Sequence, residues 1–272
     1  MIGSGEIVNT TTIHKDQTLF EKMDRDGFVK IRFSENLHDL IVRCRLVFYE
    51  VFNTLALHYG SDSVQTDRDV INLFKQHPAL QRAGYYQLKN LPVVAKIACH
   101  DDLLLWLYKL GLKFPSSAYF NNIRCDLPVK EQNIFQAHQD YIYNFGSYYS
   151  LTVWISLQDT TRKEGALRVI PGSHKRGILP HTEGLVNIDE YNQDDFISCE
   201  VEHGEALVFN QLLIHSSGIN ASKDTLRFSL QIRYNDLSAY EYLDRQLYFN
   251  YDYDSRYRFA TPEDNPVSQE QA

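Results

Sequence analysis

The sequence predicts an α+β protein whose core is a jelly roll with helices from the N-terminal part packed on it. Two changes of pattern along its 272 residues lead to this prediction. Up to about residue 112, apolar residues recur every three or four positions, which is typical of amphipathic helices. After Gly111, short runs rich in β-branched and aromatic residues follow one another between turn signals. Many short strands with few helices between them indicate a sandwich or jelly roll.

The first part of the chain is expected to hold one strand among several helices. Residues 1–15 are interpreted as a loose arm, residues 19–23 as a short helix and residues 28–33 as a strand. Ser34 is a suitable N-cap for a long helix. The apolar stripe of that helix is predicted to contain Leu37, Ile41, Cys44, Phe48, Val51 and Leu55.

Further helix starts follow from capping signals. Residues 66–69 resemble a capping box, and Pro78 and Pro92 suit the first turns of two more helices. Asp101 is expected to cap a helix over residues 103–110 that ends at Gly111. Residues 16–112 are therefore expected to be mostly helical.

The rest of the chain is predicted to form the β core over residues 113–258 of a single domain, 1–272. Residues 176–195 are interpreted as a surface loop and residues 259–272 as a disordered tail. The predicted strands are 118–125, 134–140, 150–157, 166–170, 197–201, 206–209 and 226–234.

Two of these strands have one apolar and one polar face. Along 226–234 the polar residues Arg227, Ser229, Gln231 and Arg233 alternate with apolar ones, and residues 151–158 alternate in the same way. The apolar faces are expected to pack under the helices, on the outer face of the major sheet. The polar faces then line an interior that must be wet or liganded, because buried polar groups need partners.

Composition excludes several classes of function. The formal charge of −8 argues against nucleic-acid or anionic-membrane partners, which require a basic surface. The four cysteines are far apart and form no CxxC pair, as expected for reduced thiols of a cytoplasmic protein. No apolar run reaches about 18 residues, and the N-terminus lacks a signal-peptide core.

The most informative stretch is His138-Gln139-Asp140. A His and a carboxylate two residues apart on a strand lie on the same face. His215 follows 75 residues after Asp140, and two His plus one carboxylate form the facial triad of non-haem Fe(II) sites. The alternative is a chance HxD, and His100-Asp101-Asp102 is a second copy. Because that copy lies at a predicted helix start, where residues i and i+2 diverge, it is interpreted as a cap.

A second set of residues suits a dicarboxylate. Arg227 follows His215 by 12 residues and lies on a polar strand face, where its guanidinium can form a bidentate fork with a carboxylate. Arg233 on the same face is an alternative anchor, and a structural salt bridge is another reading of Arg227. The Ser217 hydroxyl is placed to join the same carboxylate or to make a turn hydrogen bond.

With these residues in view, the chain resembles the phytanoyl-CoA dioxygenase family of Fe(II)/2-oxoglutarate-dependent oxygenases from about residue 16 to about 235. The matching stretches are 26–29, His138-Gln139-Asp140, 151–155, 165–174, 215–218, Asn220 and Arg227.

The resemblance implies a double-stranded β-helix with iron held by His138, Asp140 and His215. It implies that 2-oxoglutarate chelates the iron and places its far carboxylate on Arg227, with Ser217, Trp154 and Gln139 helping to hold it. Trp154 is alternatively a core aromatic. The implied reaction consumes O2, releases succinate and CO2, and is assayed with ascorbate as reductant.

The implied outcome is hydroxylation of an unactivated C–H bond, because Asp140 is a carboxylate whereas halogenating relatives have a small residue there. Desaturation, cyclisation and epimerisation are alternatives that start from the same chemistry.

The substrate is expected to be a small soluble metabolite, since no basic cluster suited to the phosphates of an acyl-CoA is visible. Arg124, Tyr141, Tyr143 and Arg233 are candidate substrate contacts, although the tyrosines also suit ordinary packing. The sequence does not indicate an oligomeric state.

Two functions of other classes stay open. A zinc hydrolase would use the same three ligands to activate water and would not need Arg227. A lectin-like jelly-roll binding module would not need the triad.

Overall fold

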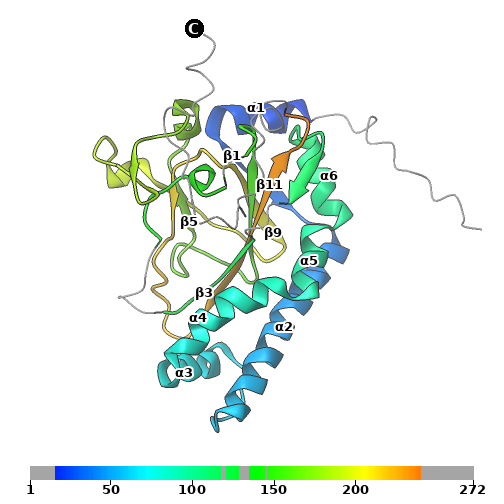
Figure 1. Cartoon of the computed structure of the whole chain (residues 1–272), viewed down its shortest axis with the longest axis vertical. Coiled ribbons are helices and arrows are strands. Elements are labelled where there is room, and N and C mark those ends of the chain that lie inside the picture. The colour runs from blue at the N-terminus through cyan, green and yellow to red at the C-terminus, as the bar shows by residue number, and fades with distance from the viewer. Residues whose placement is uncertain (1–15, 118–120, 129–134, 145, 240–272) are drawn as a thin grey trace, which may run out of the picture.

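A six-stranded antiparallel sheet forms the centre of the molecule, and helices lie along one side of it (Figure 1). The structure is a computed structural model that describes residues 16–117, 121–128, 135–144 and 146–239. The arm predicted for residues 1–15 and the tail predicted for 259–272 lie outside these residues. None of the helices in the described ranges is long and apolar enough to cross a membrane.

Six α-helices precede most of the strands among the described residues. They are α1 (Gln17–Asp26), α2 (Glu35–His58), α3 (Asp67–Gln76), α4 (Pro78–Gln87), α5 (Pro92–Ala98) and α6 (Asp101–Lys109), with the 3-10 turn η2 (Leu88–Asn90) after α4. The predicted caps are confirmed at α2, where Ser34 accepts the Leu37 N–H, and at α3, where Thr66 and Asp69 form a capping box. Pro78 and Pro92 occupy first turns, as expected.

Three details of the helices differ from the prediction. In α2 the fully buried stripe continues through Phe52 and Ala56, in steps of four residues from Cys44 onward, while the predicted Val51 and Leu55 pack against the core partly buried. At α6 the cap is His100, whose Nδ1 accepts the Asp102 N–H at 3.2 Å, and Asp101 is already helical.

The third difference is at α1, which continues beyond the predicted end at residue 23 to Asp26. It ends at Gly27, whose φ of 83° is the left-handed conformation that glycine adopts without steric cost.

The major sheet has the order β1-β9-β4-β11-β2, and β3 also pairs with β11. All of its ladders are antiparallel, as a jelly roll requires. Its strands are β1 (Phe28–Arg32), β2 (Pro115–Ser117), β3 (Asn122–Asp126), β4 (Leu151–Ser156), β9 (Glu205–Asn210) and β11 (Arg227–Asp236).

A smaller sheet faces it, with the order β10-β5-β8. These strands are β5 (Leu167–Val169), β8 (Ile197–Cys199) and β10 (His215–Ser216). Single antiparallel bridges from His138 to His215 and to Leu185 extend this sheet. The short elements nearby are the 3-10 turns η3 (Asp140–Ile142), η4 (Ser173–Arg176) and η5 (Gln193–Asp195) and the hairpin of β6 (His181–Thr182) and β7 (Leu185–Val186).

The interpretation of residues 176–195 as a surface loop was therefore wrong in part. The segment contains the β6–β7 hairpin, and Ile178, Leu179 and Val186 are buried in an apolar cluster with Ile170 and Ile214. Burial of these side chains holds the segment against the smaller sheet.

The strand predicted over 134–140 is also corrected. Ile134 lies outside the described residues, only His138 makes a ladder bridge, and Asp140 opens η3. Gln139 between them is nevertheless extended, with φ −113° and ψ 128°. The same-face argument for His138 and Asp140 therefore still applies locally.

The two faces of the major sheet have the predicted character. The apolar side chains of β4 and β11, among them Val153, Ile155, Phe228, Leu230 and Ile232, share one cluster with those of the helices. The opposite face is turned to the smaller sheet, where Trp154 packs with Leu167, Val169 and Phe209. The predicted jelly-roll core with helices on its outer face is confirmed.

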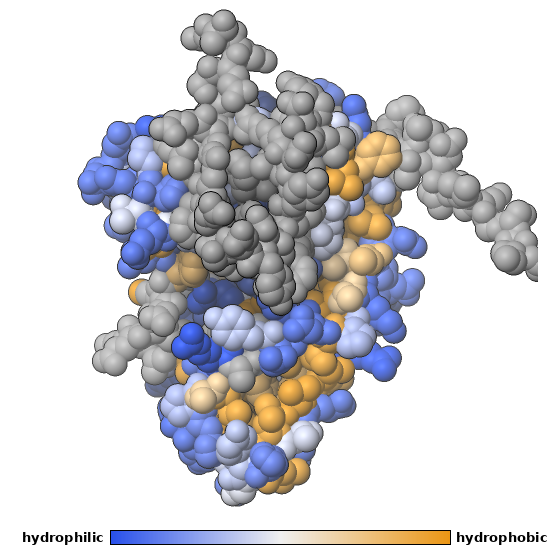
Figure 2. Space-filling view, in the orientation of Figure 1, coloured by the Kyte–Doolittle hydropathy of each residue, from blue (hydrophilic) through white to orange (hydrophobic). Residues whose placement is uncertain are grey.

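The helical layer also leaves apolar surface exposed. In the orientation of Figure 1, apolar residues gather over the lower part of the molecule, where the helices lie (Figure 2). Leu46 and Leu57 of α2 are 56% and 59% exposed.

Candidate metal centre

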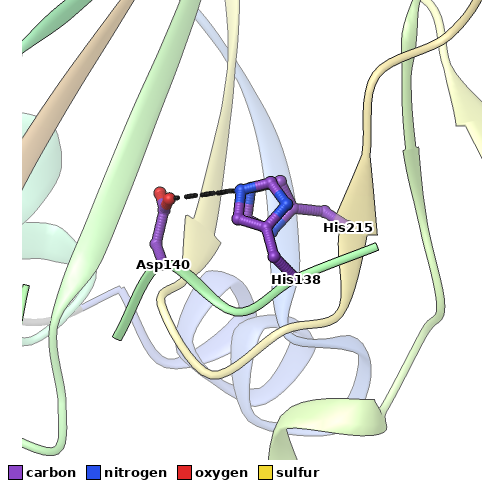
Figure 3. A group of neighbouring side chains, drawn as sticks. All are labelled: His138, Asp140 and His215. Atoms are coloured by element: carbon purple, nitrogen blue, oxygen red, sulfur yellow. Dashed lines mark ion pairs between the residues drawn. The ribbon is translucent and has the colours of Figure 1, made fainter. Parts of the chain in front are cut away.

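Three side chains from distant parts of the chain meet between the sheets. One ligand atom each of His138, Asp140 and His215 lies within 4.8 Å of the others, and all three residues are buried. His138 precedes η3, Asp140 opens it, and His215 begins β10, so the bridge between His138 and His215 brings the two imidazoles together. Figure 3 shows the carboxylate of Asp140 directed at the imidazoles.

The backbone orients both imidazoles in the same way. Nδ1 of His138 lies 2.8 Å from the carbonyl oxygen of Gln136, and Nδ1 of His215 lies 3.0 Å from that of Leu213. Because a carbonyl oxygen only accepts, each Nδ1 carries a proton, and in the neutral imidazole the Nε2 atom then presents a lone pair. These Nε2 atoms lie 3.6 Å and 3.8 Å from Oδ1 of Asp140.

Both oxygens of Asp140 have a donor on the major sheet. Nη2 of Arg233 in β11 donates to Oδ1 at 2.7 Å, and the hydroxyl of Thr152 in β4 donates to Oδ2 at 2.7 Å. Arg233, which was predicted as a substrate contact, thus forms an ion pair with a predicted metal ligand.

The charges at the three residues suit metal binding. Burial alone would raise the pKa of Asp140, but Arg233 and the imidazoles hold it well below its usual value. Burial, with help from His138, lowers the pKa of His215 to about 3. A carboxylate and a neutral imidazole are the forms that ligate divalent ions.

The distances fit a first-row metal ion. Ligand atoms about 2.1 Å from a metal and at right angles to one another are about 3 Å apart. The two distances from Asp140, 3.6 Å and 3.8 Å, therefore exceed this spacing by less than about 1 Å. The mixed nitrogen and oxygen donor set suits Fe(II), Zn(II) and similar ions.

Arg227 lies farther along β11, with its guanidinium in a buried ion pair with Asp126 of β3. Its Nη1 also donates to the carbonyl oxygens of Gly165 and Gly218. Asp126 receives a second guanidinium, because Nη2 of Arg124 lies 2.7 Å from its Oδ1. Among the described residues, both guanidinium groups thus contact the carboxylate of Asp126.

The glycines beside Arg227 permit this arrangement. A Cβ atom on Gly165, whose φ is 84°, would lie 2.7 Å from the carbonyl oxygen of Gly218. The two backbones can therefore approach closely only without side chains, and their carbonyls converge on Arg227.

Ser217 lies between His215 and Gly218 in the chain. It is buried, and its N–H donates to the carbonyl oxygen of Phe135 at 3.0 Å. The segment 215–218 thus connects the candidate metal centre with the surroundings of Arg227. Trp154 is also buried, in the apolar cluster between the sheets.

Two predicted site residues are committed to the backbone. Nε2 of Gln139 donates to the carbonyl oxygens of Gly177 at 2.8 Å and Leu212 at 2.6 Å, and its Oε1 accepts the Leu179 N–H at 2.9 Å. The hydroxyl of Tyr141, fully buried, donates to the carbonyl oxygen of Gly146 at 2.9 Å. Both side chains hold the fold around the triad together.

The other two predicted substrate residues, Tyr143 and Arg124, lie near His138 and Phe135. The ring of Tyr143 lies 6.0 Å from that of His138 and 6.2 Å from that of Phe135. Burial, together with the charge of Asp140, raises the pKa of Tyr143. Arg124 lies over the ring of Phe135, 5.8 Å from its centre, in addition to its ion pair with Asp126.

The sequence reasoning missed Thr152 and Asp126. The available signal for Thr152 was the alternation along residues 151–158, which places it on the polar face of that strand. Asp126 ends β3 with no motif around it, and only the pairing of β3 with β11 brings it opposite Arg227.

A hollow of about 930 Å³ lies at the smaller sheet, and its lining includes Ser217 and Gly218. Arg168, Ser198 and Ser216, which line it, alternate along their strands with residues such as Val169 and His215 that face inward. These three residues of the hollow therefore face away from the side of the sheet that carries His215.

A jelly roll in which two imidazoles and one carboxylate converge between the sheets belongs to the class of facial-triad metalloproteins. The comparison with protein families agrees: the model of the family described as phytanoyl-CoA dioxygenase (PhyH) matches residues 87–229, more than half of the chain. The chain belongs to this family.

Curated relatives match over shorter stretches. The phytanoyl-CoA dioxygenase of Arabidopsis thaliana is 34% identical over 158 residues, which cover 51% of this chain and 56% of the relative. The iron/alpha-ketoglutarate-dependent dioxygenase ausO of Aspergillus calidoustus is 27% identical over 170 residues, which cover 58% and 51%. The chain therefore spans about half the length of these two relatives.

Solved structures show the same fold. The apo form of the non-heme monooxygenase ThoJ has a TM-score of 0.60 at 23% identity, with 80% of this chain and 77% of that chain covered. The carbocyclase SnoK from nogalamycin biosynthesis has a TM-score of 0.54 at 18% identity, with 85% and 87% covered.

Proposed function

We propose that this chain is a non-haem Fe(II)- and 2-oxoglutarate-dependent dioxygenase. The observation that carries the proposal is the triad, because both Nε2 lone pairs and the carboxylate of Asp140 converge on one point between the sheets. The region matched by the family includes all three residues and Arg227.

His138, Asp140 and His215 would hold the iron. Three protein ligands on one face leave positions for a chelating cosubstrate and O2, and the bound iron would supply the oxidising chemistry. The chain's own contribution is to fix the ligands. The carbonyl oxygens of Gln136 and Leu213 set the imidazole tautomers, and the buried surroundings exclude bulk water from the reacting groups.

Arg227 would bind the far carboxylate of 2-oxoglutarate. Its guanidinium is buried beside the segment that follows His215, and its planar fork of donors suits a carboxylate. Ser217 lies next to Gly218, whose carbonyl oxygen accepts from Arg227, and its hydroxyl would join the same carboxylate. Trp154 would form part of the apolar wall, whereas Gln139 acts through the backbone that it holds.

The positions of the two arginines favour Arg227 over Arg233 for this role. They are six residues apart on β11, or about 20 Å along the strand. Arg233 contacts Asp140 itself, while Arg227 lies beside the segment that leads away from His215. A cosubstrate that chelates the metal at one end needs its anchor at a distance from the metal.

The substrate would be a small molecule that enters beside Tyr143 and Arg124. Hydroxylation of an unactivated C–H bond is the proposed outcome, because the carboxylate of Asp140 occupies a ligand position. Structural neighbours named as an epimerase and a carbocyclase of nogalamycin biosynthesis support epimerisation and cyclisation as alternatives. We further propose that the chain is a single domain and acts in the cytoplasm, as its separated cysteines favour.

The test is anaerobic addition of Fe(II) and 2-oxoglutarate to the metal-free chain. We expect a weak visible charge-transfer band, followed in air by succinate formation that a metabolite screen with ascorbate would find to be substrate-stimulated. Turnover that is independent of 2-oxoglutarate and unaffected by Arg227→Ala would instead indicate a zinc hydrolase. Ligand affinity that survives loss of the triad would indicate a binding module.

A further inference from the structure

We infer that Thr152 and Arg233 are positioning residues that hold Asp140 as a one-oxygen ligand of the metal. The inference rests on the proposed function and adds to it a specific role for two residues of the major sheet. Neither residue is placed as a metal ligand.

The sheet register brings the two donors together. Thr152 in β4 and Arg233 in β11 are direct partners across the antiparallel ladder. Side chains that are opposite each other in a ladder lie on the same face. Both are buried, and both reach Asp140 from the wall of the major sheet.

The contacts give the two oxygens of Asp140 different surroundings. Oδ1 faces the Nε2 atoms of both imidazoles, at 3.6 Å and 3.8 Å, so it is the oxygen directed at the metal position. Oδ2 accepts the hydroxyl of Thr152 at 2.7 Å. Arg233 donates to Oδ1 at 2.7 Å, and the second lone pair of Oδ1 is left for the metal.

This arrangement would keep coordination positions open. If the carboxylate turned and bound through both oxygens, it would occupy one of the positions that a chelating cosubstrate and O2 need. Rotation about the Cβ–Cγ bond of Asp140 would break the hydrogen bond from Thr152 and disturb the one from Arg233. Both donors are fixed in a ladder, so they oppose this rotation.

The experiment compares Mn²⁺ binding by the metal-free full chain with that of Thr152→Val, which keeps the shape and loses the donor. We expect the Mn²⁺ affinity of Thr152→Val to fall by about 10-fold or more, the usual effect of losing a residue that orients a ligand. We also expect Asp140 to bind Mn²⁺ through both oxygens, or in a rotated position, in a crystal structure of this variant. Thr152→Ser should restore both properties.

The matched control is Ser229→Ala. Ser229 is buried on the same face of β11, and its hydroxyl has no hydrogen-bond partner among the described residues. This variant should bind Mn²⁺ like the natural chain. Thermal unfolding of the metal-free variants separates a general loss of folding from a change at the site.

The role of Arg233 is tested by Arg233→Met. If Arg233 is a positioning residue, Arg233→Met should alter the Mn²⁺ coordination by Asp140 before any 2-oxoglutarate is added. A variant that changes 2-oxoglutarate or substrate affinity alone, with the same Mn²⁺ coordination, would show that Arg233 is a ligand anchor and would overturn its part in the inference.

The two proposals can fail separately. If the natural chain binds no divalent ion at the triad, the proposed function fails. If it binds Mn²⁺ there and Thr152→Val shows the same affinity and one-oxygen coordination, only the positioning role is wrong.

Discussion

The two faces of the major sheet are built from the same strands and are stabilised in different ways. On β4 and β11, Val153, Ile155, Phe228 and Leu230 pack under the helices. On the reverse, Thr152, Arg227 and Arg233 are equally buried but take part in hydrogen bonds and ion pairs. The helical face contributes stability mainly through burial of apolar side chains. On the inner face, hydrogen bonds and ion pairs offset the cost of burying Thr152, Arg227 and Arg233.

The difference shows where function can be placed on such a sheet. Apolar packing tolerates exchange of similar side chains, whereas a buried polar network depends on each member. Changes on the inner face should therefore alter binding, and changes on the outer face should alter stability. Four substitutions test this contrast.

The largest effect is expected from Asp140→Ala on the inner face. The change removes a metal ligand, so the charge-transfer band with Fe(II) and 2-oxoglutarate and the formation of succinate should both disappear. The measurement is the anaerobic absorption spectrum followed by a succinate assay. Asp224→Ala, at an exposed ion pair with Arg68, is the control. A band of normal intensity in Asp140→Ala would contradict the assignment.

Phe228→Ala tests the outer face. Phe228 is fully buried against Phe48 and Phe52 of α2, and truncation of such a side chain costs about 3–5 kcal/mol. We expect this loss in the free energy of unfolding by urea. The folded fraction should bind 2-oxoglutarate normally. Phe114→Ala, at a residue 59% exposed, should change little.

Arg227→Lys sharpens the comparison, because it keeps the charge and loses the planar fork. The loss of a charged hydrogen bond, about 1.5–3 kcal/mol, corresponds to an increase of about 10- to 100-fold in the Kd for 2-oxoglutarate. Titration of the Mn²⁺-loaded chain measures it. The control is Arg68→Lys, and an unchanged Kd in Arg227→Lys would argue for Arg233 as the anchor.

The smallest effect concerns His203, at the edge of the helical face, whose ring lies against that of His38. Burial, with the charges of His38 and Arg45, lowers the pKa of His203 from 6.5. As the pH falls below about 6.5, His203 of the unfolded chain takes up a proton that the folded chain binds less tightly. The free energy of unfolding therefore decreases as the pH falls from about 6.5 toward the lower pKa of the folded state.

His203→Gln should therefore lose less stability between pH 7.5 and pH 5.5 than the natural chain does. The expected difference is under about 1 kcal/mol, and urea unfolding at the two pH values measures it. An equal or steeper loss in the variant would mean that His203 does not contribute to the pH dependence.

Much of the fold was predictable because its signals are local. The caps at Ser34 and Thr66, the first-turn prolines and the alternation along β4 and β11 each depend on neighbouring residues. The errors have non-local causes. The hairpin within residues 176–195 is held by apolar contacts with the smaller sheet, and His138 is extended by single bridges to His215 and Leu185.

For the candidate metal centre too, some residues were predictable from local signals and others were not. The spacing of His138 and Asp140, with the resemblance to a known family, was enough to select His215 and Arg227 from the sequence. The residues that contact these side chains could not be predicted from the sequence. Asp126 meets Arg227 because the two are partners in the register of β3 and β11. Thr152 and Arg233 are partners across β4 and β11, and both contact Asp140 of η3.

The sequence by itself determined which residues can bind a metal and a dicarboxylate. The type of side chain decides which ligands it can bind, and the alternation of side chains between the two faces of a strand follows from local backbone geometry. Only the tertiary structure decided which arginine contacts which carboxylate. That choice depends on contacts between residues far apart in the sequence, because 93 residues separate Arg233 from Asp140 and 101 separate Arg227 from Asp126. No local pattern encodes such a distance.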